Sequence, residues 1–184
     1  MTVAQRMTAD EYLATEFDQR VELIGGEVVV NQPRLTHGLV NTELIFVLRT
    51  WTDASDGRGM VVAPIDVRLD DRNVYAPDIL WYSAARAPAT DGPWPYPVPD
   101  LAIEIRSPST WRYDVGIKKS TYEREGLPEL WLVDTEMRSV LVFRRSSKGA
   151  ASFDVALELD GDARLESPLL PGFGVAVDGI FPAA

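Results

Sequence analysis

The sequence contains no cysteine and a single histidine, His37. The absence of cysteine excludes disulfides, thiolate metal sites and cysteine nucleophiles, and it fits a cytoplasmic location. With one histidine, neither an all-histidine zinc site nor a serine–histidine triad is expected. No apolar run approaches the roughly 20 residues of a membrane-spanning helix. We therefore expect a cytoplasmic protein without a membrane segment, whose chemistry depends on carboxylates and amines.

Positive charge is also scarce, because 18 lysines and arginines face 28 aspartates and glutamates, for a formal net charge of −10. This balance argues against a broadly basic surface for nucleic acid. If the substrate is a nucleic acid, the positive charge must be local. Five basic residues within nineteen positions form either such a local patch or ordinary solvated surface charge: Arg106, Arg112, Lys118, Lys119 and Arg124.

The length of 184 residues, with 46% hydrophobic and 25% charged residues, predicts one globular domain over residues 1–184. Near its start, Thr8 followed by Glu11 is a capping-box pattern that predicts a helix over residues 8–16. The segments RVELI and EVVV flank Gly25-Gly26, which predicts a β-hairpin. A second helix should begin with Thr36 as its cap and reach Trp51, with one apolar stripe: Val40, Leu44, Val47, Leu48 and Trp51.

The middle of the chain is rich in predicted strands. MVVAPIDVRL (60–69) reads as one long strand, and the turn DDRN leads into a strand that starts at Asp78. The proline-rich residues 84–99 predict a stiff surface loop. LAIEIR (101–106) is typical of a central strand buried on both faces.

A helix ending near Gly126 should connect this central strand to ELWLVD (129–134) as a right-handed parallel crossover. The tail is rich in β-structure, and SPLLPGFGVAV (167–177) is expected to pack on the sheet edge. The predicted fold is of the α/β (α+β) class: a mixed sheet with helices on both faces, an N-terminal helix and hairpin, and a β-rich C-terminal tail.

Two of these predicted strands carry a carboxylate, Asp78 and Glu104. A carboxylate on a buried strand is costly unless something binds it, and two acids with an amine nearby suit a divalent-metal phosphodiester site. The alternative for Asp78 is a turn or cap residue. The alternative for Glu104 is a structural contact with Arg106, which shares its face of the strand.

Lys118 and Lys119 follow on the next predicted helix. If this helix starts near Asp114, Val115 and Tyr122 mark its inward face. The two lysines lie on either side of that line, so periodicity does not choose between them. Either lysine could direct its ammonium group at the acids, or both could extend into water.

Together these segments resemble the PD-(D/E)xK nuclease superfamily and, within it, the Uma2 family of restriction-endonuclease-like proteins, also known as DUF820. The resemblance extends from about residue 8 to residue 181. It is carried by VELIGGEVV, the helix opening around His37, APIDVRL, APDILW, AIEIRSPST, DVGIKKSTYEREGLPELWLVD and SPLLPGF.

This resemblance implies a restriction-endonuclease-like core and a site for Mg²⁺ or Mn²⁺. Asp78 would be the metal-binding acid of the PD element, Glu104 the second acidic ligand and the carbonyl of Ile105 a third. Lys118 is in register with the catalytic lysine of the family. The superfamily position two residues after the second acid holds Arg106, which cannot act as a base but could hold a phosphate.

The resemblance also implies that Glu22 completes the acid cluster, with Glu43 as a competing candidate. His37 could contact a phosphate at the helix N-terminus, or it could simply face solvent. With Arg106, Lys119 completes the predicted substrate-binding set.

The expected reaction is metal-dependent hydrolysis of DNA phosphodiester bonds. The alternatives are a nuclease fold that has lost catalysis and serves in binding or assembly, and an enzyme acting on RNA or a nucleotide. Because a nuclease of this kind needs two active sites to cut both strands, we also expect a homodimer, with WPYPVP as one candidate contact surface.

Overall fold

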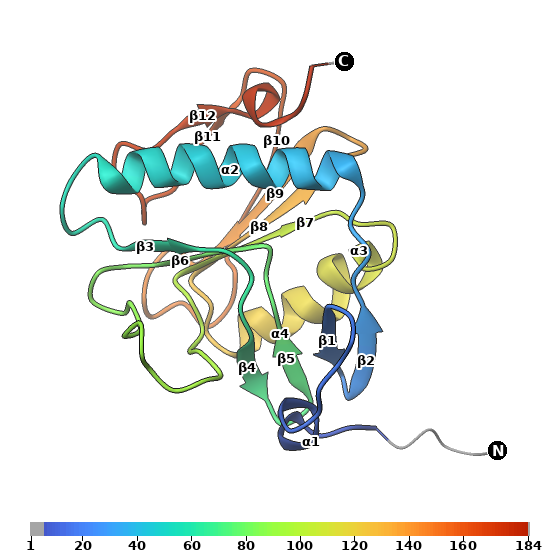
Figure 1. Ribbon diagram of the computed structural model, residues 1–184. Coiled ribbons are helices and arrows are strands. Elements are labelled where there is room, and N and C mark those ends of the chain that lie inside the picture. Colours follow the sequence, from blue (N-terminus) through green and yellow to red (C-terminus); the bar gives the residue numbers. More distant parts are fainter. Residues whose placement is uncertain (1–5, 184) are drawn as a thin grey trace.

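Two β-sheets of different size form the framework of the protein (Figure 1). The computed structural model describes residues 6–183, so residues 1–5 and 184 of the predicted domain lie outside the described part. The large sheet has the strand order β10 (Val155–Asp160), β9 (Ser139–Arg144), β8 (Glu129–Asp134), β7 (Leu101–Ile105), β6 (Ile79–Tyr82) and β3 (Met60–Val62). The β7–β8 pair at its centre is parallel, as predicted, and its other neighbouring strands are antiparallel.

The small sheet is antiparallel throughout. Its strand order is β2 (Glu27–Val30), β1 (Val21–Ile24), β5 (Asn73–Tyr75) and β4 (Val67–Asp70). The β1–β2 pair is the predicted hairpin around Gly25-Gly26, and both glycines have the positive φ angles that this tight turn requires. The hairpin prediction is therefore confirmed.

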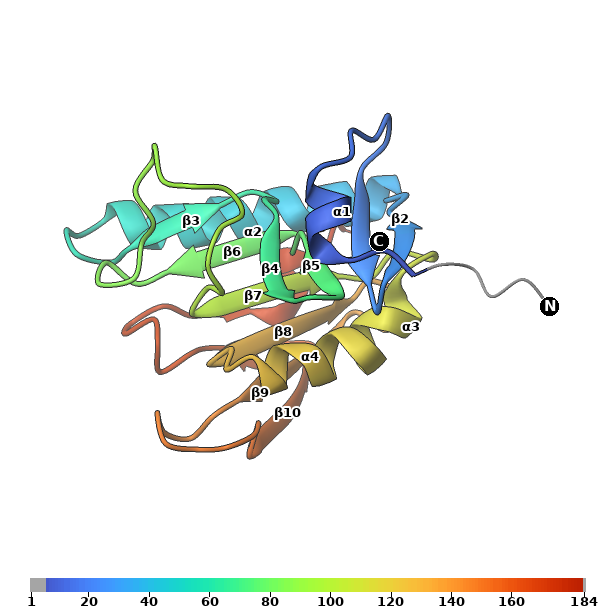
Figure 2. The same ribbon diagram turned by 90° about the horizontal axis from the view of Figure 1, so that it is seen from below.

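Helices cover both faces of the large sheet (Figures 1 and 2). The long helix α2 (Leu35–Asp53) lies on one face, and the segment between β7 and β8 lies on the other as α3 (Trp111–Tyr113), the π-helical turn η1 (Asp114–Lys118) and α4 (Lys119–Arg124). The short helix α1 (Ala9–Leu13) begins with the predicted capping box at Thr8 and Glu11. Within residues 6–183, no helix is both long and apolar enough to cross a membrane.

The central strand β7 separates two apolar cores, because successive side chains of a strand face opposite ways. Ile103 and Ile105 pack in the core beneath α2. Ala102 packs on the other side with Tyr122 of α4 and Leu130 of β8. Glu104 shares the side of Ala102, so the fold directs this carboxylate toward α4.

Helix α2 confirms the predicted apolar stripe, since its buried residues include Val40, Leu44, Leu48 and Trp51. Its start differs from the prediction. The N-cap is Arg34, which makes no side-chain capping hydrogen bond, and Thr36 lies inside the first turn. This N-terminus therefore keeps free backbone N–H groups and the positive end of the helix dipole.

The prediction of one long strand over residues 60–69 is wrong. It is divided into β3, which pairs with β6 in the large sheet, and β4, which pairs with β5 in the small sheet. Pro64 lies at the division, where its missing N–H cannot contribute to a ladder. Asp78 likewise does not start a strand but lies in the link from β5 to β6, just before Ile79.

The tail covers the α2 side of the large sheet, where the 3₁₀ helix η2 (Val177–Ile180) contacts the edge strand β10, as predicted, and also α2. It also forms β11 (Arg164–Leu165) and β12 (Val175–Ala176). Its apolar residues join the core beneath α2, and Trp51 Nε1 donates a hydrogen bond to the carbonyl of Pro171 at 3.2 Å. The apolar spacing of α2 did not predict that the tail would pack on this helix, because an apolar stripe shows that residues are buried but not which segment buries them.

Candidate active site

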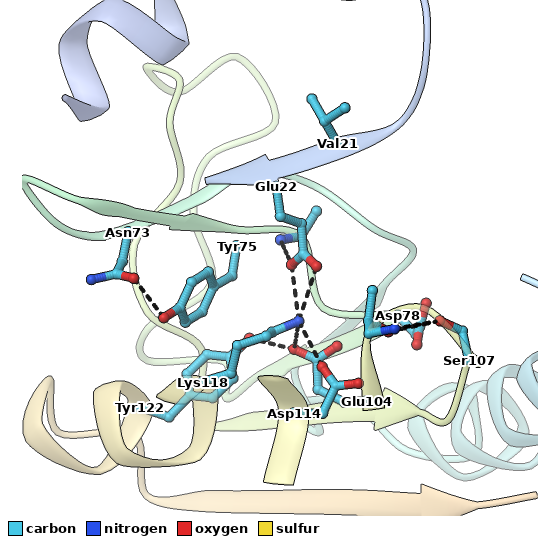
Figure 3. A network of polar contacts seen from close by, with 12 residues as sticks. Val21, Glu22, Asn73, Tyr75, Asp78, Glu104, Ser107, Asp114, Lys118 and Tyr122 are labelled. Carbon is cyan, nitrogen blue, oxygen red and sulfur yellow. Dashed lines mark hydrogen bonds and ion pairs between the residues drawn. The ribbon is translucent and has the colours of Figure 1, made fainter. Parts of the chain in front are cut away.

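A buried cluster of charged and phenolic side chains lies where the small sheet meets the large sheet (Figure 3). Every member has a relative exposure of 4% or less. The members come from six segments of the chain: Glu22 of β1, Tyr75 of β5, Asp78 before β6, Glu104 of β7, Asp114 and Lys118 of η1, and Tyr122 of α4. The fold thus gathers residues that are as much as 100 positions apart in the sequence, as from Glu22 to Tyr122.

The strand register brings the two predicted metal ligands together. Ile79 of β6 is paired with Ile103 of β7 in an antiparallel ladder. Continuing this register by one residue sets Asp78 opposite Glu104, and facing residues of neighbouring strands have Cβ atoms about 5 Å apart. The carboxylates therefore converge from adjacent segments on the α4 side of the sheet.

Asp78 is held by the backbone of β7 and by two basic side chains. Its Oδ2 accepts a hydrogen bond from the Ile105 N–H at 2.8 Å and lies 3.1 Å from His37 Nε2. Its Oδ1 lies 3.4 Å from Nη2 of Arg20, which also donates to the carbonyl of Ala76 at 3.1 Å. Asp78 is thus not a turn cap, and His37, which is buried, does not face solvent.

Lys118 forms the centre of the cluster. Its Nζ lies 2.8 Å from Glu104 Oε1, 3.0 Å from Glu22 Oε1 and 3.1 Å from Asp114 Oδ1. The ring of Tyr75 lies beneath the ammonium group, 5.3 Å from Nζ to the ring centroid. The fold brings Lys118, and not Lys119, to the acids.

Further hydrogen bonds orient the carboxylates. Glu104 Oε1 accepts one from the Tyr122 hydroxyl at 2.7 Å, and Glu22 Oε1 accepts one from the Ala76 N–H at 2.8 Å. Asp114 Oδ1 lies near Lys118 Nζ but outside hydrogen-bonding geometry, so this buried oxygen has no hydrogen-bond partner among the described residues. The cluster therefore retains unused acceptor capacity.

Burial and like charges shift the proton affinities of the whole cluster. Burial raises the pKa of Glu104 well above its usual value, against the opposing effect of Lys118. Burial also raises the pKa of Asp114 to about 6. For Lys118, burial alone would lower the pKa, but the neighbouring carboxylates outweigh it and raise the pKa well above that of an ordinary lysine. Lys118 is therefore a firmly protonated cation at neutral pH.

Lys118 faces inward together with two residues at helical spacing. Asp114 lies four residues before it in the π-helical turn, Tyr122 lies four residues after it in α4, and all three are buried. Val115, which the sequence places on the inward face, is 41% exposed, so that prediction is wrong. Tyr122 is buried as expected. π-Helical turns are rare and often lie at functional sites.

Other predicted site residues lie outside the cluster. Arg106 does not contact Glu104; its guanidinium pairs with Asp134 at 2.8 Å and Glu136 at 2.6 Å. Lys119 places its Nζ 4.6 Å from the ring centroid of Phe143. Glu43 lies on α2, on the opposite face of the large sheet from the side that Glu104 faces.

A small cavity of about 110 Å³ adjoins the cluster at the start of α2. Its lining includes Arg34, Thr36, His37 and Arg106. The buried Arg106 Nε has no hydrogen-bond partner among the described residues. Glu136, which pairs with Arg106, also lines the cavity, while Arg34 and the positive end of a 19-residue helix favour an anion there.

Four residues of the site were not singled out as site residues from the sequence: Arg20, Tyr75, Asp114 and Tyr122. Asp114 had a usable signal, since an acid four residues before a lysine pairs with it on one helical face. Arg20 and Tyr122 had none, because their contacts with Asp78 and Glu104 depend on tertiary structure.

The whole fold matches a solved structure described as a "putative nuclease belonging to DUF820" from Anabaena variabilis ATCC 29413. The TM-score is 0.79 at 21% sequence identity, over 95% of this chain and 97% of that chain. This likeness establishes the class of fold, a mixed α/β fold of the nuclease type, and confirms the predicted fold class.

The family follows from the sequence. The model of the Uma2 family, described as "putative restriction endonuclease", matches residues 9–178. The chain belongs to the Uma2 family, which confirms the resemblance found in the sequence. No curated protein matches the chain.

Proposed function

We propose that this protein is a cytoplasmic, Mg²⁺- or Mn²⁺-dependent endonuclease that hydrolyses DNA phosphodiester bonds. The observation that carries the proposal is the convergence of Asp78 and Glu104 beside the ammonium group of Lys118, 2.8 Å from Glu104. Membership of the Uma2 family supports nuclease chemistry at this site.

The donor set suits a hard cation. Within residues 6–183, no three acidic or imidazole side chains are arranged to hold a metal ion by themselves. Mg²⁺, however, is usually bound by only one or two carboxylates together with waters and substrate phosphates. Asp78 and Glu104 would supply those carboxylates, and the Ile105 carbonyl a third oxygen.

The charge of the cluster supports the same assignment. The cluster contains four carboxylates: Glu22, Glu104 and Asp114 contact Lys118, and Asp78 is paired with Arg20 and His37. The excess negative charge is part of what raises the pKa of Glu104. A divalent ion would offset that charge, and Glu22 and Asp114 would then serve to hold Lys118 rather than to bind the ion.

The bound ion and the surrounding side chains would have different roles in hydrolysis. A divalent ion bound at Asp78 and Glu104 would supply Lewis acidity toward the scissile phosphate and lower the pKa of water. Lys118, held protonated, orients the attacking water and stabilises the negative charge that develops on the phosphate, and it does not act as a base. Tyr122 fixes the orientation of Glu104 through its hydroxyl.

The cavity at the start of α2 would hold a phosphate of the same strand. His37 and Arg106 line it and would contact that phosphate. Lys119 lies against Phe143 and would contribute to DNA binding only through its charge. The homodimer stays a prediction, which sedimentation velocity would check.

The proposal is tested by plasmid nicking with Mg²⁺ or Mn²⁺ and by calorimetric titration of Mn²⁺. Asp78→Asn and Glu104→Gln should each reduce cleavage at least about a hundredfold, because a preorganised charge contact is lost from the transition state. Glu104→Gln should also weaken Mn²⁺ binding.

Glu129→Gln is the matched control. Glu129 is an equally buried glutamate of β8, held by Trp131 and Ser167 far from the cluster. It should retain cleavage in the folded variant, as judged by circular dichroism. Wild-type cleavage in Glu104→Gln would refute the proposal. Absence of both cleavage and Mn²⁺ binding in the wild-type protein would instead favour the non-catalytic binding or assembly module.

A further inference from the structure

A second and larger cavity lies on the other side of the small sheet from the acid cluster. Its volume is about 600 Å³, within the usual range for small-molecule sites. Val21 of β1 lines this cavity, whereas its neighbour Glu22 faces the cluster, and their side chains extend in opposite directions in Figure 3. The two sites are therefore separated by a single layer of strands.

Aromatic rings line much of this cavity. Tyr12, Phe17, Trp94 and Tyr96 all contribute, from α1, the link to β1 and the proline-rich loop. Trp94 is 51% exposed, which is unusual for so large an apolar side chain. Its Nε1 donates a hydrogen bond to Asp66 Oδ2 at 3.2 Å, which fixes the position of the indole. The ring is thus held in place while much of it stays accessible.

The loop that carries these rings is tied to the framework. The Tyr96 N–H donates to the carbonyl of Asp66 at 3.0 Å, and Tyr96 forms a β-bridge with Val67 at the start of β4. The Tyr82 hydroxyl donates to the carbonyl of Pro97 at 2.8 Å. The cavity is therefore a preformed site with an aromatic wall.

Two residues of the cavity wall also contact the acid cluster. Arg20 lies 3.4 Å from Asp78 Oδ1, and the Ala76 N–H donates to Glu22. A nucleic acid strand with a phosphate beside Asp78 would follow the Arg20 guanidinium around the edge of the small sheet. The nucleotide next along that strand would then reach the aromatic wall.

We propose that this cavity binds an unpaired nucleobase of the strand whose phosphate lies at Asp78, so that the substrate is single-stranded nucleic acid or a duplex with an extruded base. This inference rests on the proposed nuclease function. Every base has a π-face that can stack on tryptophan or tyrosine, and such stacking tolerates any sequence. Gln19 and Asp66, which also line the cavity, can bond to the polar edge of a base that has no pairing partner.

A paired base cannot enter this cavity while it is stacked in a duplex, so the proposal predicts a preference for unpaired strands. Base stacking also makes binding less dependent on positive surface charge, which a chain of net charge −10 can provide only locally. Stacking contributes affinity that does not depend on neutralising phosphates.

The test is fluorescence anisotropy of a short fluorescein-labelled single-stranded oligodeoxynucleotide with the full chain, in EDTA and at one fixed salt concentration. Trp94→Ala should weaken binding about five- to a hundredfold, and Trp94→Phe, which keeps a stacking ring, should recover most of it. Phe46→Ala removes a similarly exposed ring from α2, outside both cavities, and is the matched control. The duplex of the same sequence should bind at least tenfold more weakly, by about 1.4 kcal/mol. A strand of abasic deoxyribose phosphate should also bind more weakly.

Equal affinity of Trp94→Ala and wild type would overturn the inference, as would equal affinity for the abasic strand. It would also be overturned if Trp94→Ala dissociated a homodimer in sedimentation velocity, because Trp94 would then be a subunit contact. Binding in EDTA is measured apart from cleavage. Binding that depends on Trp94, without cleavage of any substrate, would support the base site and refute the nuclease assignment. Cleavage together with binding that is the same in Trp94→Ala and wild type would support the nuclease assignment and refute the base site.

Discussion

Replacing Lys118 by methionine removes the ammonium group from the centre of the acid cluster while keeping a side chain of similar length. Three carboxylate groups each place an oxygen within 3.1 Å of Nζ. Breaking a buried ion pair by removing one partner costs about 3–5 kcal/mol, because the remaining charge is left uncompensated. That cost is a large part of a typical stability of about 5–15 kcal/mol. For a chain of this size it corresponds to a fall in Tm of about 6–20 °C.

The penalty of Lys118→Met should depend on pH. Burial raises the pKa values of Glu104 and Asp114 in the folded state, the latter to about 6. Carboxyl groups with raised folded pKa values contribute stability that is fully present below their unfolded pKa of about 4 and is lost as the pH rises through the folded values. Without the ammonium group these pKa values rise further. The penalty should therefore be small near pH 4.5 and should grow toward pH 8.

The assay is urea unfolding followed by circular dichroism at several pH values. Lys119→Met is the matched control, because Lys119 loses only its contact with the Phe143 ring and should cost about 0.5–1 kcal/mol. In the Glu104→Gln background, Lys118→Met should lower the free energy of unfolding by less than it does in the wild type, since the two residues are coupled. A penalty no larger than that of Lys119→Met, or one independent of pH, would show that the Lys118 ammonium group does not hold the buried carboxylates in their charged form.

Two further predictions concern a tight backbone contact of the fold and a member of the acid cluster. Gly59→Ala should be strongly destabilising in urea unfolding, because the new Cβ would lie 2.0 Å from the Tyr82 carbonyl oxygen. Gly57→Ala, with a similar positive φ but open space around it, should cost only about 1–2 kcal/mol, and equal costs would contradict the steric argument. Tyr122→Phe should cost about 1.5–3 kcal/mol in the same assay through the loss of the hydroxyl that donates to Glu104, and it should lower cleavage if that bond orients the carboxylate. Unchanged stability would show that the hydroxyl is dispensable.

The sequence predicted those parts of the fold whose pattern is local. The near-continuous apolar run of β7, the paired glycines after β1 and the stripe of α2 each identify an element by composition and spacing. Glu104 could be identified for the same reason, because a carboxylate within such a run needs a partner. The approach of Asp78 to it follows from strand pairing.

The parts that the sequence did not predict depend on partners distant in the chain. The segment over residues 60–69 looks continuous, but its halves pair with different sheets. The sequence placed Val115 on the inward face, whereas Asp114, Lys118 and Tyr122 form that face in the structure. The apolar residues of the tail predicted a contact with the sheet, but they did not reveal that α2 would be their second partner.

The contact between Glu22 and Lys118 joins residues 96 positions apart, and this separation matters while the protein is being made. The hairpin that carries Glu22 leaves the ribosome well before Lys118 is synthesised. Until then its carboxylate stays hydrated, and the interior where it will be buried is still incomplete. Long-range contacts of this kind form slowly, because a large loop must close before they form. A nascent or truncated chain that ends before the π-helical turn therefore cannot assemble the acid cluster. Any nuclease activity would be confined to chains in which this turn has been synthesised.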